Sequence, residues 1–177
     1  MEIAEDRFAT WVKVSHTLAK FEFFMVPLAQ RLGKLDATLI EEDGRLIKLS
    51  SKDLESIPET LSLNDHITFS YLWILGTYEL IRTLDQRCKE KPSLLDEQLR
   101  NDVRNTKYSF ERLRIPLAKM EPAQRHRQTD YTIAYPAINP RLGIAWKVSD
   151  DMFISRRELS DLFLNLLRRM LTNTITR

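Results

Sequence analysis

The segment from His66 to Cys88 constrains the fold most, because apolar side chains surround its predicted helix axis instead of forming one stripe. At about 100° per residue, these side chains cannot all face one neighbouring element. The sequence therefore predicts a central helix enclosed by other helices. Its apolar positions are Ile67, Phe69, Leu72, Trp73, Ile74, Leu75, Tyr78, Leu80, Ile81 and Leu84.

Three further helices are predicted from apolar residues that recur three and four positions apart. The first covers residues 5–32 and ends at Gly33, and the others cover residues 93–117 and 155–171. Each has one apolar side, which suits a helix that packs against the central one. The result is a bundle of four substantial helices.

Two segments carry β signals. Residues 38–49 place Asp43-Gly44 between two short β-prone runs, a pattern typical of a hairpin. Residues 142–154 contain an alternation of apolar and other residues, followed by a turn and a second short apolar run. Residues 121–140 are rich in proline and are expected to form a packed loop.

The predicted class is therefore mainly α, a four-helix bundle-like domain with a small antiparallel β hairpin or sheet at residues 38–49 and 142–154. We expect residues 1–177 to form a single domain, because a chain of this length buries enough surface for one core. Whether the two β segments join one sheet is not determined by the sequence.

Composition favours a cytoplasmic location. Its apolar stretches are interrupted too early to span a bilayer, so no membrane partner is expected. The N-terminal residues include acids where a signal peptide has basic residues. The single cysteine, Cys88, suits a reducing compartment.

Known catalytic and cofactor motifs are absent from the sequence. Its four glycines allow neither a phosphate-binding loop nor a dinucleotide-binding turn. One cysteine and three dispersed histidines form no recognisable metal-ligand pattern, and there is no GxSxG nucleophile turn. We therefore expect no cofactor and no metal, and a non-catalytic role is favoured over an enzymatic one.

Glu79 and Arg82 are the first candidate site. They lie three residues apart in the predicted central helix, so they can pair on one face. If that face is internal, the two side chains form either a buried pair that fixes helix register or a polar pocket for a small anionic ligand. An enzyme would use Glu79 there as an acid or base.

A second candidate site is basic. Residues 1–66 carry eight basic and twelve acidic side chains, whereas residues 67–177 carry nineteen and thirteen. Guanidinium groups bind phosphate, and nearby tyrosines can stack on unpaired bases, so this set predicts contacts with RNA or DNA. The alternative is an ordinary solvated helix face. The candidate residues are Arg104, Arg112, Arg114, Arg125 and Arg127.

Our leading hypothesis is a non-catalytic cytoplasmic helical protein that acts through protein association as a homo-oligomer. Its contact surfaces are expected on the aromatic-rich segment Phe8 to Leu28 and on the last helix, because both have wide apolar faces. The alternatives are an RNA- or DNA-associated regulatory or defence protein, and an enzyme with a Glu79/Arg82 site in the bundle core.

Overall fold

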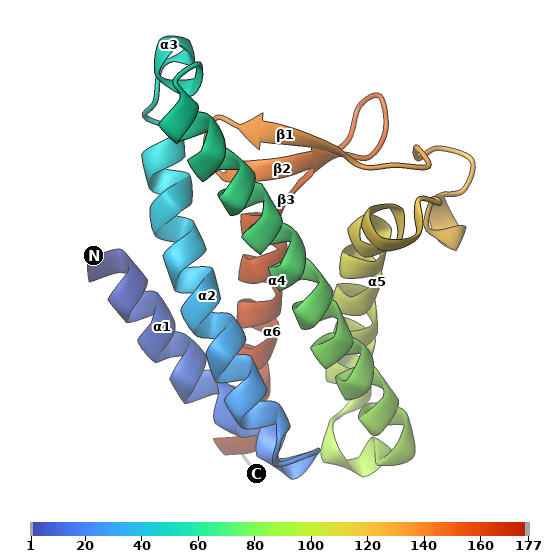
Figure 1. The fold of residues 1–177 in the computed structure, drawn as a ribbon. Helices are drawn as coiled ribbons and strands as arrows, with labels where there is room; N and C mark the ends of the chain where they lie inside the picture. Colours follow the sequence, from blue (N-terminus) through green and yellow to red (C-terminus); the bar gives the residue numbers. More distant parts are fainter. Residues whose placement is uncertain (1, 176–177) are drawn as a thin grey trace.

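The computed structural model describes residues 2–175, which form helices at both ends of the chain and a small sheet before the last helix (Figure 1). The long helices are α1 (Glu2–Ser15), α2 (Met25–Leu46), α4 (Ile57–Glu90), α5 (Glu97–Lys119) and α6 (Arg156–Ile175). Shorter elements are η1 (His16–Lys20), α3 (Ser51–Leu54), η2 (Pro92–Leu94), η3 (Gln124–His126), β1 (Tyr135–Asn139), β2 (Gly143–Lys147) and β3 (Phe153–Ser155).

The five long helices close into a ring. Helix α1 packs on α2, α2 on α4, α4 on α5, α5 on α6, and α6 returns to α1. The mainly α class with a small antiparallel sheet is thus confirmed, with one long helix more than the sequence predicts. The extra helix arises because the segment predicted as one helix over residues 5–32 divides into α1 and the start of α2.

Gly33 does not end a helix, contrary to the sequence prediction, and close contact between α1 and α2 explains why this position is a glycine. It lies inside α2, where an added Cβ atom would sit 2.4 Å from both Cβ and Cγ of Trp11. Glycine therefore allows the buried Trp11 indole to pack directly against the α2 backbone.

The hairpin predicted for residues 38–49 is wrong, because α2 continues to Leu46. Leu39, Ile40, Asp43 and Leu46 are buried at helical spacing, and the packing of this face outweighs the local turn preference of Asp43-Gly44. In a β-hairpin, alternate side chains point to opposite faces, so about half of these side chains would be exposed to water.

The sheet lies at one end of the bundle, beside the end of α2 and the starts of α4 and α6 (Figure 1). Its strand order is β1-β2-β3, with both pairs antiparallel. The β signal in residues 142–154 is confirmed. Strand β1 lies in the proline-rich stretch expected to be a loop, and Pro136 is tolerated because β1 is an edge strand.

Helix α4 is not the enclosed centre of the bundle. Trp73, Ile74 and Ile81 face the core and are fully buried, but Phe69 is 49% exposed and Leu72 is 50% exposed. The prediction of a fully wrapped helix is therefore wrong. No helix within residues 2–175 is long and apolar enough to cross a membrane.

Candidate functional site

Glu79 and Arg82 form the expected ion pair, with Arg82 Nε 2.7 Å from Glu79 Oε2. Their side chains are 46% and 52% exposed, so the expectation that they lie in the bundle core is wrong. Arg114 joins them, 3.5 Å from Glu79 and stacked over the Tyr78 ring. The group is a surface cluster on α4 and α5.

The five candidate arginines do not form one continuous surface of unpaired guanidinium groups. Arg112 donates to both carboxylate oxygens of the buried Asp130 side chain, at 2.7 and 2.8 Å. Arg125 stacks over the Tyr108 ring at 3.5 Å, and Arg114 is held as described above. A phosphate would have to compete with these carboxylates for Arg112 and Arg114, whereas ring stacking does not occupy the N–H donors of Arg125. Arg104 and Arg127 are exposed on α5 and after η3, respectively.

A buried ion network, absent from our sequence-based candidates, joins α2, α6, α4 and the sheet. The fully buried Arg156 donates to Asp36 at 2.6 Å and to Asp43 at 2.5 Å. The other oxygen of Asp43 lies 2.8 Å from Nε2 of His66 and accepts the backbone N–H of Ile144 at 3.0 Å. Asp43 therefore connects three helices to strand β2.

Helix α1 closes the network from the other side. Arg7 donates to Asp36 at 2.6 Å, and the Trp11 indole N–H donates to the same oxygen at 2.9 Å. Arg7 also binds Ser160 and Asp161 of α6. Two guanidinium groups thus balance the two buried carboxylates, which removes most of the cost of placing either charge alone in the interior.

The network favours the ionised form of Asp43. Burial opposes ionisation, but the hydrogen bond with His66, the charge of Arg156 and the Ile144 N–H together hold the pKa of this carboxyl below its usual value. Asp36 and Asp43 lie seven residues apart, two turns of one helix. That spacing is the available sequence signal, and it is visible only if residues 38–49 are read as helical.

A groove of about 500 Å³ lies between α2 and α4, with the network behind it. His66 lines it and is only 5% exposed; within residues 2–175 its Nδ1 atom has no hydrogen-bond partner. Most of the other walls are apolar, and two carboxylates lie among them. The remaining lining residues are Leu35, Thr38, Leu39, Glu42, Pro58, Leu61, Ser62, Asp65 and Phe69.

The groove is part of a larger apolar surface, which we call the α2–α4 face and define by the partly buried Leu35 and the exposed Phe24, Leu28, Leu61, Phe69 and Leu72. Phe24 is 76% exposed and Leu61 is 60% exposed. Figure 1 shows α2 and α4 lying in front of α6, with no other described element over them. The face runs along most of the bundle.

Comparisons with protein-family models, with curated proteins and with solved structures found no match. The fold and the site therefore define the class directly: a five-helix bundle with a sheet at one end, a buried ion network and an exposed apolar face on α2 and α4. Within residues 2–175, no cluster of His, Cys, Asp and Glu side chains has the arrangement of a metal site.

Proposed function

We propose that this protein acts through protein association, as a non-catalytic homo-oligomer whose contact surface is the α2–α4 face. The observation that supports this proposal is the exposure of large apolar side chains at helical spacing along two adjacent helices. Exposed apolar surface of this kind marks interaction sites on folded proteins, because leaving it in water is unfavourable.

This surface differs from the two expected from the sequence. The apolar side of α6 is used inside the bundle, where Phe163 and Leu167 are fully buried. In the segment Phe8 to Leu28, the indole of Trp11 is buried as well, while Phe24 and Leu28 remain exposed. The proposed contact surface therefore keeps the end of that segment and adds α4.

A second copy is the occupant that the chemistry of the face favours. The face carries a projecting aromatic side chain, Phe24, and an apolar groove that can receive one. It also carries the exposed cation Arg31 on α2 and the exposed carboxylate Asp65 at the groove, where Glu42 is already paired with Arg45. A surface that carries an aromatic side chain with a matching groove, and a cation with a matching carboxylate, can bind a copy of itself.

The proposal is tested by light scattering coupled to size-exclusion chromatography. We expect the wild-type protein to elute with the mass of a dimer at high loading, and the double variant Phe69→Asp, Leu72→Asp to elute as a folded monomer. Both positions are half exposed, so neither aspartate disrupts the core. The matched control is Ile133→Asp, at an exposed apolar loop position outside the face, which should remain dimeric. A dimeric double variant would contradict the proposal.

We also place this function in the cytoplasm. The lone Cys88, buried near the end of α4, supports that proposal, because a single cysteine cannot form an internal disulfide and the fold therefore suits a reducing compartment. Expression in a reducing host without loss of folding or association is the expected result.

A further inference from the structure

We propose that a pocket between α1, α2 and α6 binds an amphipathic anion, that is, a carboxylate or phosphate group joined to a short apolar body. This site goes beyond the proposed association, because the pocket and the α2–α4 groove share no lining residue. The pocket measures about 530 Å³, a volume typical of small-molecule sites.

The walls of the pocket come from segments that the fold brings together. Helix α2 supplies Ile40 and Gly44, which lie one turn apart, and the chain just after α2 adds Leu49. Ala4 comes from the first turn of α1, and Arg157 comes from the first turn of α6. Ala4 and Ile40 are buried, so the floor of the pocket is apolar. A bound apolar group would gain by leaving water there.

Gly44 opens this floor. A Cβ atom added at Gly44 would meet no neighbouring heavy atom within 4 Å, so packing does not require glycine at this position. Its backbone is helical, with no positive φ that would favour glycine. Glycine inside a helix is unfavourable relative to alanine. The effect of the missing side chain is open space beside the α2 backbone, which a ligand can approach closely.

Two cations without a partner line the same pocket. Lys48 follows α2 and Arg157 begins α6, and among the described residues neither side chain has an ion-pair or hydrogen-bond partner. Arg45 also lines the pocket, but two glutamates of α2 and α4 hold it. The only carboxylate among the described lining residues, Glu41, already has an interaction partner. The uncompensated charge of the lining is therefore positive.

This combination favours an amphipathic anion over other ligands. A cationic ligand would be repelled by Lys48 and Arg157, and a neutral apolar ligand would make no use of either charge. A guanidinium group binds carboxylate and phosphate oxygens through paired N–H donors, and the lysine ammonium group adds a second charge. An anion with an apolar tail uses both the cations and the apolar floor.

The buried ion network holds the pocket walls in place. Arg156, the neighbour of Arg157, binds Asp36 and Asp43 and so fixes the first turn of α6 against α2. Arg7 binds Asp36 as well, which ties α1 to the same point. Little ordering of the backbone is therefore required when a ligand binds, and the entropic cost of binding is lowered.

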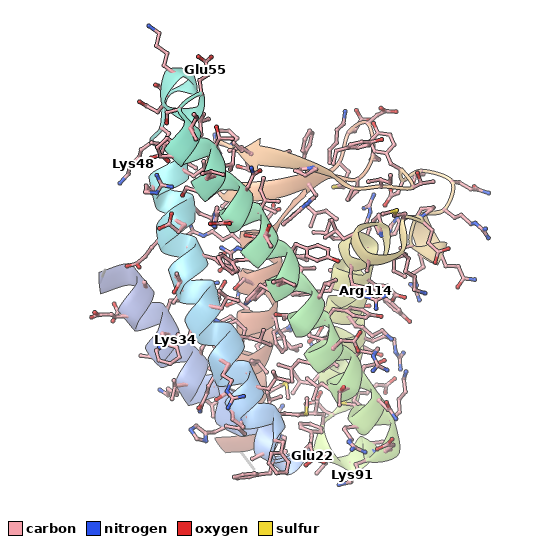
Figure 2. All side chains as sticks on the ribbon, in the orientation of Figure 1. Glu22, Lys34, Lys48, Glu55, Lys91 and Arg114 are labelled. Atoms are coloured by element: carbon pink, nitrogen blue, oxygen red, sulfur yellow. The ribbon has the colours of Figure 1, made fainter. Side chains whose placement is uncertain are left out.

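Figure 2 shows Lys48 at one end of α2, on the side of the helix where α1 begins. Two exposed cations on the same helices lie away from the pocket and provide matched controls. Lys34 precedes Gly44 by ten residues in α2, ~15 Å along the axis. Arg168 follows Arg157 by eleven residues in α6, ~16 Å along the axis.

Titration of the isotope-labelled full-length protein with octanoate, followed by amide NMR shifts, tests the site. We expect octanoate to shift the Gly44 amide signal until it saturates. The double variant Lys48→Ala, Arg157→Ala should raise the dissociation constant roughly tenfold or more, because two charge-assisted contacts are lost. The control Lys34→Ala, Arg168→Ala removes the same two charges and should bind octanoate as wild type does.

The variant Gly44→Leu tests the apolar floor. Its side chain enters open space, so circular dichroism should show a folded protein. Octanoate binding should nevertheless weaken by about tenfold or more, because the leucine occupies the pocket. Wild-type affinity in folded Gly44→Leu would exclude this floor as the binding surface.

Ligands that differ in one part define the chemical class. Octylamine and octanol keep the apolar tail but change the head group, and both should bind much more weakly than octanoate. Inorganic phosphate has no tail and should bind more weakly than octyl phosphate. The relative affinities of octyl phosphate and octanoate then show which anionic head group the two cations prefer, and either order supports the site.

Three further results would overturn the inference. A Gly44 amide signal that octanoate does not shift would exclude binding at this pocket. Equal affinities of the double variant and its matched control would show that Lys48 and Arg157 do not hold the anion. Octylamine that binds as tightly as octanoate would exclude an anion site. The oligomeric state, which tests the proposed function, is measured separately and does not depend on these results.

Discussion

Arg156 and Asp43 bind each other at 2.5 Å in the protein interior, although 113 residues separate them in the sequence. The same guanidinium also binds Asp36, which lies two turns before Asp43 on α2. A single side chain therefore fixes α6 against α2. Because His66 and the Ile144 N–H share Asp43, the position of α4 and of strand β2 depends on this pair too.

Substitution of Arg156 should therefore lower the free energy of unfolding strongly. Arg156→Ala leaves two buried carboxylates short of their main partner, and removal of one member of a buried ion pair costs about 3–5 kcal/mol. Urea denaturation followed by circular dichroism measures this loss in the free energy of unfolding. Arg82→Ala, in the half-exposed pair with Glu79, is the matched control and should change stability little. Equal effects of the two substitutions would contradict the role assigned to the network.

Lowering the pH should reduce the free energy of unfolding through protonation of Asp43. Its pKa is lower in the folded state than in the unfolded chain, so its contribution is complete above the unfolded value and is lost as pH falls through the folded value. Unfolding free energies of wild type and Asp43→Asn should differ most near neutral pH and converge in acid. The measurement is a set of urea titrations at descending pH. A difference that is constant with pH would contradict the prediction.

Cys88 should be unreactive while the protein is folded. The thiol is buried in α4, and burial, with the nearby charge of Asp85, raises its pKa to about 11. Since the thiolate is the reactive form, iodoacetamide at mildly alkaline pH should label the native protein slowly and the urea-unfolded protein rapidly. Intact mass spectrometry measures the labelled fraction. Equal labelling rates would show that the end of α4 opens readily.

Two glycines of α2 should respond in opposite directions to the same substitution. Gly33→Ala places a methyl group against Trp11 and should destabilise the protein by about 1–3 kcal/mol. Gly44→Ala meets no atom within 4 Å and should raise stability by up to about 1 kcal/mol, because alanine favours the helix. Thermal unfolding of the two variants measures both effects. A Gly33→Ala variant as stable as wild type would contradict the close α1–α2 contact.

Periodicity predicted the elements whose faces are simple. The structure matches the predicted apolar stripes of α5, with Val103 and Phe110 buried, and of α6. It also matches strand β2 and the turn that follows it. Periodicity misled for α4, where outward Phe69 and Leu72 look like core residues. A helix with one face in the core and another exposed apolar face has the same pattern as an enclosed helix.

The network could not be predicted from local patterns. The contacts of Arg7 with Asp161 and of Ile144 with Asp43 join residues 154 and 101 positions apart. Such pairings arise from the packing of whole helices, whereas Asp43-Gly44 favours a turn in isolation. The Glu79–Arg82 pair was predicted because its geometry is local, and its exposure was mispredicted because exposure depends on neighbouring helices.

The most direct test of the central claim is the mass of the wild-type protein by sedimentation equilibrium from ~1 to ~200 µM, the range in which interfaces of modest affinity form. Association through the α2–α4 face predicts a rise with concentration from the chain mass of 20.9 kDa to twice that value and no further. A mass that stays at 20.9 kDa over the whole range would contradict the account.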